Sequence, residues 1–294
     1  MNDSNKLTPQ SADKSIGNII AEAKNLTPAQ VDAVVSHQKT TGQKFGEAAV
    51  ALGLAKNEDV IWALSQQFHY PYASEGSLSV SSELVAATSP FDAPAEFFRD
   101  IRSQLIAEVF NGKEPRCALA VCSADVGDGK TYFAANLAVA FSQLGHRTLL
   151  VDADMRKPRI HDVFGVGTAN SGGLSSVLSG RAETNVIRPI DALPSLYVLP
   201  VGVTPPNPLE LVQGIAFDLL LNELVSKFEY VIVDTPAAAH GADAKVIAAK
   251  CGASVAICRQ GVTDAKVLRT LVTTLDKSCA KFAGAVMNAH SGRS

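Results

Sequence analysis

The chain has 294 residues, 47% of them apolar, and a formal net charge of −3 at pH 7. This length suggests two domains, and the slightly acidic balance excludes a general attraction to nucleic acid or to an anionic bilayer. The first residues are polar and no apolar window approaches the roughly 18 residues that span a bilayer, which excludes a signal peptide and a membrane helix. We therefore expect a cytoplasmic protein that binds no nucleic acid and reaches a membrane only through a partner.

The amino-terminal part contains two similar segments. When Ile16–Gln38 is aligned with Phe45–Gln67, Gly17 matches Gly46 and apolar positions match throughout. The second half of each copy, VDAVVSHQ and VIWALSQQ, has apolar residues at three- and four-residue spacing, which indicates helix. We predict a small duplicated helical domain at residues 11–73 with a regulatory or docking role. An ordinary helical bundle with accidental similarity is the alternative.

A Ser-rich stretch with two prolines follows, and it predicts a linker at residues 74–92 with one short helix at SSELVAA. From residue 93 to residue 290 helical stretches alternate with short apolar runs that are rich in β-branched residues. This alternation predicts an α/β domain with a mostly parallel sheet, in which ligands bind beyond the carboxyl ends of the strands. The expected strands are RCALAVC, RTLLVDA, LYVLPVG, YVIVDTP, SVAICR and GAVMN.

The stretch SADVGDGKTYFAANLAVAF connects the first of these strands to a helix. Ala124, Gly129, Lys130 and Thr131 have the spacing of a phosphate-binding P-loop, with alanine at the first glycine position. The glycines let the backbone approach phosphates, the lysine supplies positive charge, and the threonine hydroxyl can bind Mg²⁺. The stretch therefore predicts an ATP site. The residues expected to contact the nucleotide here are Val126, Gly127, Asp128, Gly129, Lys130, Thr131 and Tyr132.

Carboxylates end two other strands. Asp152 and Asp154 follow RTLLV, and Asp234 ends YVIVD. We expect these side chains to converge on a phosphate-bound Mg²⁺ held by Thr131, Asp152 and Asp234, which are the parts that phosphoryl transfer requires. An aspartate at a strand end that only caps the next helix is the alternative.

These motifs have a family resemblance. SADVGDGKT, VDADMRKP and VIVDTP resemble the Walker A, A′ and B motifs of bacterial tyrosine kinases, in the MinD/ParA-like branch of P-loop folds, and the likeness runs from about Ala93 to Asn288. It implies a catalytic set of Lys130, Asp152, Asp154 and Arg156, in which Asp152 assists the acceptor hydroxyl or binds metal. It also implies that Asn288 contacts the base.

The segment AEFFRDIRSQL adds a second specific likeness. Glu96, Arg99 and Arg102 have the Glu-x-x-Arg-x-x-Arg spacing through which such kinases form rings, so a homo-oligomer is implied. A solvated charged helix face is the alternative.

The amino-terminal repeats resemble those of type II secretion and type IV pilus ATPases, some of which bind cyclic di-GMP. Lys24, Ser15 and Ala49 depart from that pattern, so cyclic di-GMP is a hypothesis for this domain. The complete arrangement resembles the exopolysaccharide chain-length-determinant kinases. This resemblance implies a membrane chain-length determinant as partner, whose cytosolic tail completes the active site and recruits the chain to the inner face of the membrane.

The acceptor is not evident from the sequence, because no tyrosine follows Tyr230 and the carboxy-terminal tyrosine cluster of many such kinases is absent. Either the phosphate acceptor is a tyrosine elsewhere in the chain or in another protein, or the domain phosphorylates no protein and is only an ATPase switch of the MinD/ParA type. Those ATPases carry a signature lysine where this chain has Asp125. A third alternative is a binding module in which nucleotide only reports state to a partner. The candidate acceptors in the chain are Tyr70, Tyr72, Tyr132 and Tyr197.

Overall fold

The computed structural model describes residues 15–67, 81–112, 115–167, 171–181 and 185–289. The chain forms two compact units, Met1–Glu75 and Gly76–Ser294. Each unit has its own apolar core, so each is described by itself.

The described residues of the first unit, 15–67, form four helices: α1 (Ile16–Ala23), α2 (Pro28–Thr41), α3 (Phe45–Ala51) and α4 (Asn57–Gln67). The paired helices α1 and α3 begin at equivalent positions of the two aligned segments, as do α2 and α4. The matched glycines lie where another helix comes close: a Cβ on Gly17 would be 3.3 Å from the Phe45 ring, and one on Gly46 would be 2.5 Å from Val60. The small core around Ile20, Val34 and Ala63 depends on these close approaches.

The role of this unit stays a prediction. Lys24, which departs from the repeat pattern, forms an ion pair of 2.8 Å with Asp59 at the start of α4. Its ammonium group therefore already has a partner in the described structure. Cyclic di-GMP binding remains a hypothesis.

The second unit contains a seven-stranded sheet in the order β3-β4-β2-β5-β1-β6-β7, and all pairings are parallel except that of β3 with β4. All six predicted strands are present. The two-residue strand β3 at the edge of the sheet was not predicted. The strands are β1 (Ala118–Ser123), β2 (Thr148–Asp152), β3 (Arg188–Pro189), β4 (Leu196–Leu199), β5 (Tyr230–Asp234), β6 (Gly252–Arg259) and β7 (Lys281–Asn288).

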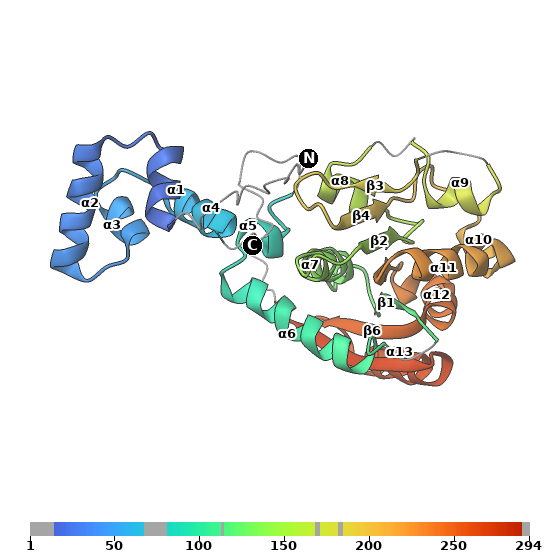
Figure 1. Cartoon of the computed structure of the whole chain (residues 1–294). Helices are drawn as coiled ribbons and strands as arrows, with labels where there is room; N and C mark the ends of the chain where they lie inside the picture. The colour runs from blue at the N-terminus through green and yellow to red at the C-terminus, as the bar shows by residue number, and fades with distance from the viewer. Residues whose placement is uncertain (1–14, 68–80, 113–114, 168–170, 182–184, 290–294) are drawn as a thin grey trace, which may run out of the picture. The chain divides into compact units, whose positions relative to one another are not determined.

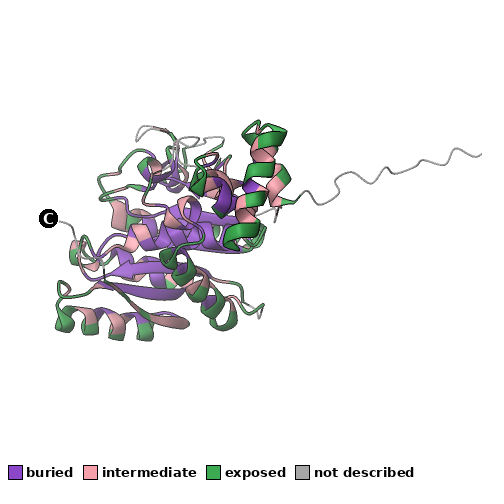
Figure 2. Cartoon of the chain, turned by 90° about the vertical axis from the view of Figure 1, so that its left-hand side faces the viewer, coloured by how far each residue is buried: buried purple, intermediate pink, exposed green. Residues whose placement is uncertain are grey.

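Helices cover both faces of the sheet (Figure 1). One face packs on α7 (Lys130–Ser142), whose outer side is covered by α5 (Val85–Thr88), α6 (Ala93–Glu108) and α8 (Ile160–Phe164). The alternate side chains of β1, at Ala118, Ala120 and Cys122, join the core of the other face. The central strands are buried while the outer helices keep exposed sides (Figure 2), which explains why the strands are apolar throughout. The other face is covered by α9 (Leu174–Leu178), α10 (Pro208–Gln213), α11 (Ile215–Lys227), α12 (Asp243–Cys251) and α13 (Ala265–Ser278).

The second unit begins earlier than the predicted boundary at Ala93. Leu84, Ala86 and Ala87 are buried, and the Ala86 amide donates to Asn136 Oδ1 on α7 at 2.9 Å. The Asn136 amide group in turn donates to the Glu83 carbonyl at 2.9 Å. Residues 81–92, which the sequence assigned to a linker, are therefore packed against the sheet domain.

Candidate active site

The P-loop lies between β1 and α7, as predicted. Gly127 and Gly129 have φ angles of 90° and 98°, a region in which side chains other than glycine are strained. A Cβ on Gly129 would also lie 2.3 Å from Asn288 Nδ2. Lys130 begins α7, so the backbone amides of the loop and of the first helical turn form an anion site.

The predicted carboxylates converge beside this loop. Asp152 and Asp234 are register partners at the carboxyl ends of the neighbouring strands β2 and β5. Thr131 Oγ1 donates to Asp234 Oδ2 at 2.7 Å. Lys130 Nζ is 2.9 Å from Asp154 Oδ2. The structure therefore brings together beside the P-loop the predicted residues Lys130, Thr131, Asp152, Asp154 and Asp234.

The electrostatics of this cluster follow from its burial. Burial raises the pKa of Asp234 to about 6, and burial together with the charge of Asp234 holds the pKa of Asp152 well above its ordinary value. Burial on its own would lower the pKa of Lys130, but Asp234 and Asp154 raise it. The lysine is thus firmly charged, while the carboxylates repel one another. A divalent cation would relieve that repulsion.

The described residues fit Mg²⁺ bound in part by phosphate. Asp234 Oδ1 is buried and has no hydrogen-bond partner, which leaves a carboxylate oxygen for a cation. Among the described residues no group of three or more His, Cys, Asp or Glu side chains forms a metal cage. Mg²⁺ commonly takes one or two carboxylates and completes its shell with water and phosphate oxygens.

Asp152 is held more tightly than the sequence suggested. Its oxygens accept the amides of Asp154 and Ile160, both at 3.1 Å. Asp152 thus accepts the first amide of α8, although the N-cap residue of that helix is Arg159. The carboxylate is also fixed next to Asp234. Its roles as metal ligand and acceptor-side base stay predictions.

Arg156 points to a different partner. Its Nη2 donates to both carboxylate oxygens of Asp243 at 3.1 and 3.0 Å, and Asp243 is buried at the start of α12. Its backbone amide donates to Asp154 Oδ1 at 3.2 Å. The side chain of Arg156 is thus engaged by Asp243, and the catalytic role that the resemblance implies for Arg156 stays a prediction.

A cavity of about 840 Å³ adjoins the P-loop. Tyr132 and Asn288, both predicted to contact nucleotide, line it together with Gly127 and Gly129. Val126 is 52% exposed and is not among the residues that line it. The cavity has the size and place that a nucleoside next to the phosphate loop requires.

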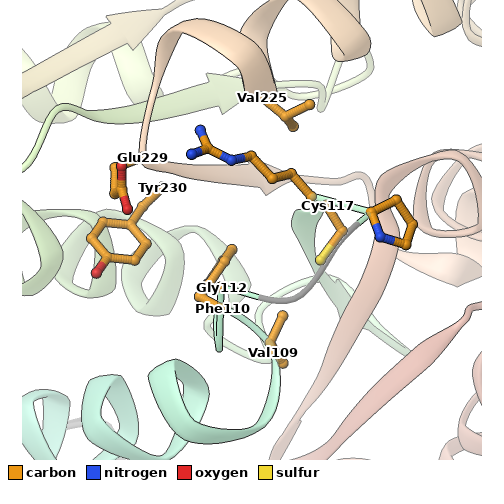
Figure 3. A pocket seen from close by; sticks show the side chains of 9 residues that line it. Val109, Phe110, Gly112, Cys117, Val225, Glu229 and Tyr230 are labelled. Carbon is orange, nitrogen blue, oxygen red and sulfur yellow. The ribbon is translucent and has the colours of Figure 1, made fainter.

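A smaller cavity of about 90 Å³, shown in Figure 3, is lined by Val109, Cys117 and Tyr230. Cys117 directly precedes β1, and Tyr230 begins β5. This cavity therefore lies at the amino ends of the strands, at the edge of the sheet opposite the P-loop, and is no part of the nucleotide site.

One set of contacts was not predicted. The sequence suggested that Asp128 contacts nucleotide, but its carboxylate is buried and accepts the Asp125 amide at 2.9 Å and the Thr263 hydroxyl at 2.7 Å. Asn288 Nδ2 donates to the Asp128 carbonyl at 3.1 Å. These bonds fix the loop against the ends of β6 and β7. No motif pointed to Thr263, because the contact joins residues far apart in the chain.

The predicted oligomerisation residues lie on α6. Arg99 pairs with Glu96 at 2.5 Å and donates to the Pro90 carbonyl, and Arg102 Nη1 donates to the Ala140 carbonyl at 2.6 Å. Both arginines therefore have partners within the chain. Their role in a ring stays a prediction.

Comparison with known proteins assigns the family. The model of the CobQ/CobB/MinD/ParA nucleotide binding domain matches residues 119–294. The tyrosine-protein kinase CpsD of Streptococcus agalactiae is 33% identical over 193 residues, which cover 66% of this chain and 82% of CpsD. The chain belongs to the bacterial tyrosine-protein kinases. The kinase domain of the Escherichia coli tyrosine kinase ETK superposes with a TM-score of 0.65 and 30% identity, covering 72% of this chain and 81% of that one.

Other members of the family are longer. The tyrosine-protein kinase wzc of Salmonella typhi is 31% identical over 207 residues, which are 70% of this chain but 28% of wzc. The match thus spans less than a third of wzc.

Proposed function

We propose that the chain is an ATP-dependent protein tyrosine kinase that regulates the chain length, polymerisation and export of an exopolysaccharide. The observation that carries the proposal is the cluster in which Lys130 pairs with Asp154 and Thr131 bonds Asp234. The family members named as tyrosine-protein kinases support the reaction.

The geometry accounts for how such a transfer would work. The P-loop amides and Lys130 bind the phosphates, and Lys130 would leave Asp154 for the more strongly charged phosphate oxygens. Thr131 and Asp234 would hold Mg²⁺, which supplies charge neutralisation for the leaving and transferred groups. Asp152 has a raised pKa, so it suits the role of a group that takes the proton of the acceptor hydroxyl.

An ATPase switch of the MinD/ParA type is the second candidate, since the same parts would hydrolyse ATP. Asp125 stands at the position where those ATPases have their signature lysine, which favours the kinase. The third alternative, a binding module without turnover, requires an inert pocket, whereas Lys130, Asp152 and Asp234 are all in place beside the P-loop.

A membrane partner is part of the proposal. In the described part of the chain no helix is both long and apolar enough to cross a membrane. Phe97 and Met287 line the large cavity yet are 43% and 62% exposed. Because both exposed apolar side chains line one cavity, we propose that they contact the cytosolic tail of a chain-length determinant that recruits the chain to the membrane.

Homo-oligomerisation through α6 is proposed on the Glu96, Arg99 and Arg102 spacing. Glu96 is 62% exposed, so its replacement leaves the fold intact. We expect Glu96→Ala to reduce the molar mass measured by light scattering without changing nucleotide affinity. A mass equal to that of the wild type argues against this surface as the interface.

The reaction is tested by incubating the full chain with γ-labelled ATP and Mg²⁺, with and without the partner tail, while free phosphate and protein-bound label are counted separately. Lys130→Met is the inactive blank. The matched control is Lys227→Met, which replaces an exposed lysine that pairs with Glu223. Protein-bound label on tyrosine that is lost only in Lys130→Met supports the kinase. Free phosphate without label supports the switch.

The acceptor remains open within this proposal. Of the candidate tyrosines, Tyr132 lines the large cavity, and Tyr197 packs against Phe228 and under the Arg147 guanidinium. Tyr70 and Tyr72 lie outside the described residues. Peptide mapping of the labelled protein identifies which of them, or which partner tyrosine, receives the phosphate.

A further inference from the structure

Arg159 lies at the nucleotide site although no motif singled it out. It directly precedes α8, whose first amide, that of Ile160, is fixed by Asp152. Arg159 and Glu83 line the same cavity of about 840 Å³ as the P-loop residues Gly127 and Gly129. A cation is therefore placed beside the loop that binds phosphate.

The Arg159 guanidinium is held by Glu83. Its Nη2 lies 2.9 and 3.0 Å from the two carboxylate oxygens. Glu83 itself is anchored, because its carbonyl accepts Asn136 Nδ2 from α7 and its amide donates to Ser81 Oγ at 3.2 Å. The acidic partner is thus fixed to the domain by its main chain, while the arginine has a long side chain that can turn.

The ion pair is exposed enough to exchange partners. The side chains of Arg159 and Glu83 are 52% and 43% exposed, and pairs of this kind contribute little net stability. A nucleoside triphosphate carries several negative charges, whereas the Glu83 carboxylate carries one. Guanidinium groups also bind phosphate oxygens with two parallel hydrogen bonds.

We propose that Arg159 is a phosphate-binding residue of this site, and that it leaves Glu83 for the terminal phosphates when nucleotide binds. Glu83 then limits nucleotide affinity in the free protein, and the segment of residues 81–88 is coupled to the state of the pocket. This inference shares one premise with the proposed function, namely that the pocket binds ATP.

The test is the affinity of the full chain for the non-hydrolysable ATP analogue AMP-PNP with Mg²⁺, measured by isothermal titration calorimetry. The variants are Glu83→Gln, Arg159→Gln and the double variant. Glu223→Gln, which removes the acid of an exposed pair on α11, is the matched control. Melting temperatures of all variants verify that the fold is unchanged.

We expect Glu83→Gln to bind about threefold more tightly, because the competing pair is lost, and Arg159→Gln to bind about tenfold more weakly, because charge-assisted bonds are lost. The double variant should match Arg159→Gln, and Glu223→Gln should match the wild type. The proposal is overturned by unchanged or weaker binding in Glu83→Gln, or by unchanged binding in Arg159→Gln. Because binding is measured without turnover, a wild-type chain that binds the analogue but phosphorylates nothing refutes the kinase and leaves this inference intact.

Discussion

Asp234→Asn should make the nucleotide-free, metal-free protein more stable near neutral pH while removing its activity. Folding moves the Asp234 carboxyl into a buried site, which raises its pKa from 3.8 to about 6. The folded state therefore binds the proton more tightly than the unfolded chain, so stability falls as the pH rises through this window and the loss is complete above it.

The magnitude follows from the pKa values. A tenfold change in an ionisation constant corresponds to about 1.4 kcal/mol, so the ionised Asp234 costs roughly 3 kcal/mol at pH 8 and about 1 kcal/mol at pH 4.5. The asparagine variant avoids this cost and can still accept the Thr131 hydroxyl hydrogen bond. Lys130 keeps Asp154 as its partner at 2.9 Å. We therefore expect a gain of up to about 3 kcal/mol at pH 8.

The assay is urea unfolding of the full chain in EDTA at pH 4.5 and pH 8, followed by circular dichroism. The single tryptophan, Trp62, lies in the first unit, so its fluorescence reports that unit separately and should not change. Asp276→Asn, at an exposed carboxylate on α13, is the control. Equal gains at both pH values, or a less stable variant at pH 8, refute the reasoning.

Three other substitutions test separate parts of the site. Gly129→Ala should weaken MgADP binding by about 1–3 kcal/mol in calorimetry, because Gly129 has a positive φ and a Cβ there would collide with Asn288. The control is Gly145→Ala, because Gly145 also has a positive φ but a Cβ there would meet no atom within 4 Å, so this variant should bind MgADP normally. Equal MgADP binding by the two variants contradicts the steric explanation. Asn136→Ala should lower the unfolding free energy by about 1–3 kcal/mol, since it leaves the buried amide of Ala86 unpaired, and an unchanged urea midpoint shows that residues 81–92 do not stabilise the domain. Thr263→Val should raise the KM for ATP about tenfold with Thr263→Ser near wild type, whereas equal effects of both would contradict a hydrogen-bonding role.

The sheet domain was predictable because its signals are local. Each central strand is an apolar run bounded by turn residues, and the P-loop carries its spacing within nine residues, from Ser123 to Thr131. The convergence of Asp152 with Asp234 followed from one general property of parallel sheets, that their carboxyl ends share an edge.

The parts that were missed depend on contacts between distant residues. Residues 81–92 look like a linker because they are rich in serine and contain a proline, and distant residues such as the buried Asn136 on α7 reveal where they dock. The bond from the Thr263 hydroxyl to the Asp128 carboxylate joins residues far apart in the chain, while the nucleotide contact of Asp128 stays a prediction. The two-residue strand β3 is too short to have a periodicity.

The proposed reaction of this pocket is the transfer of phosphate from ATP to tyrosine. The most direct measurement is mass spectrometry of a Glu–Tyr copolymer and of the chain itself after incubation with ATP and Mg²⁺, in parallel with Lys130→Met. We expect phosphotyrosine in the wild-type reaction and none in the variant. ATP consumption by the wild type without phosphotyrosine on either polypeptide would contradict it, and the nucleotide site would then be that of a switch.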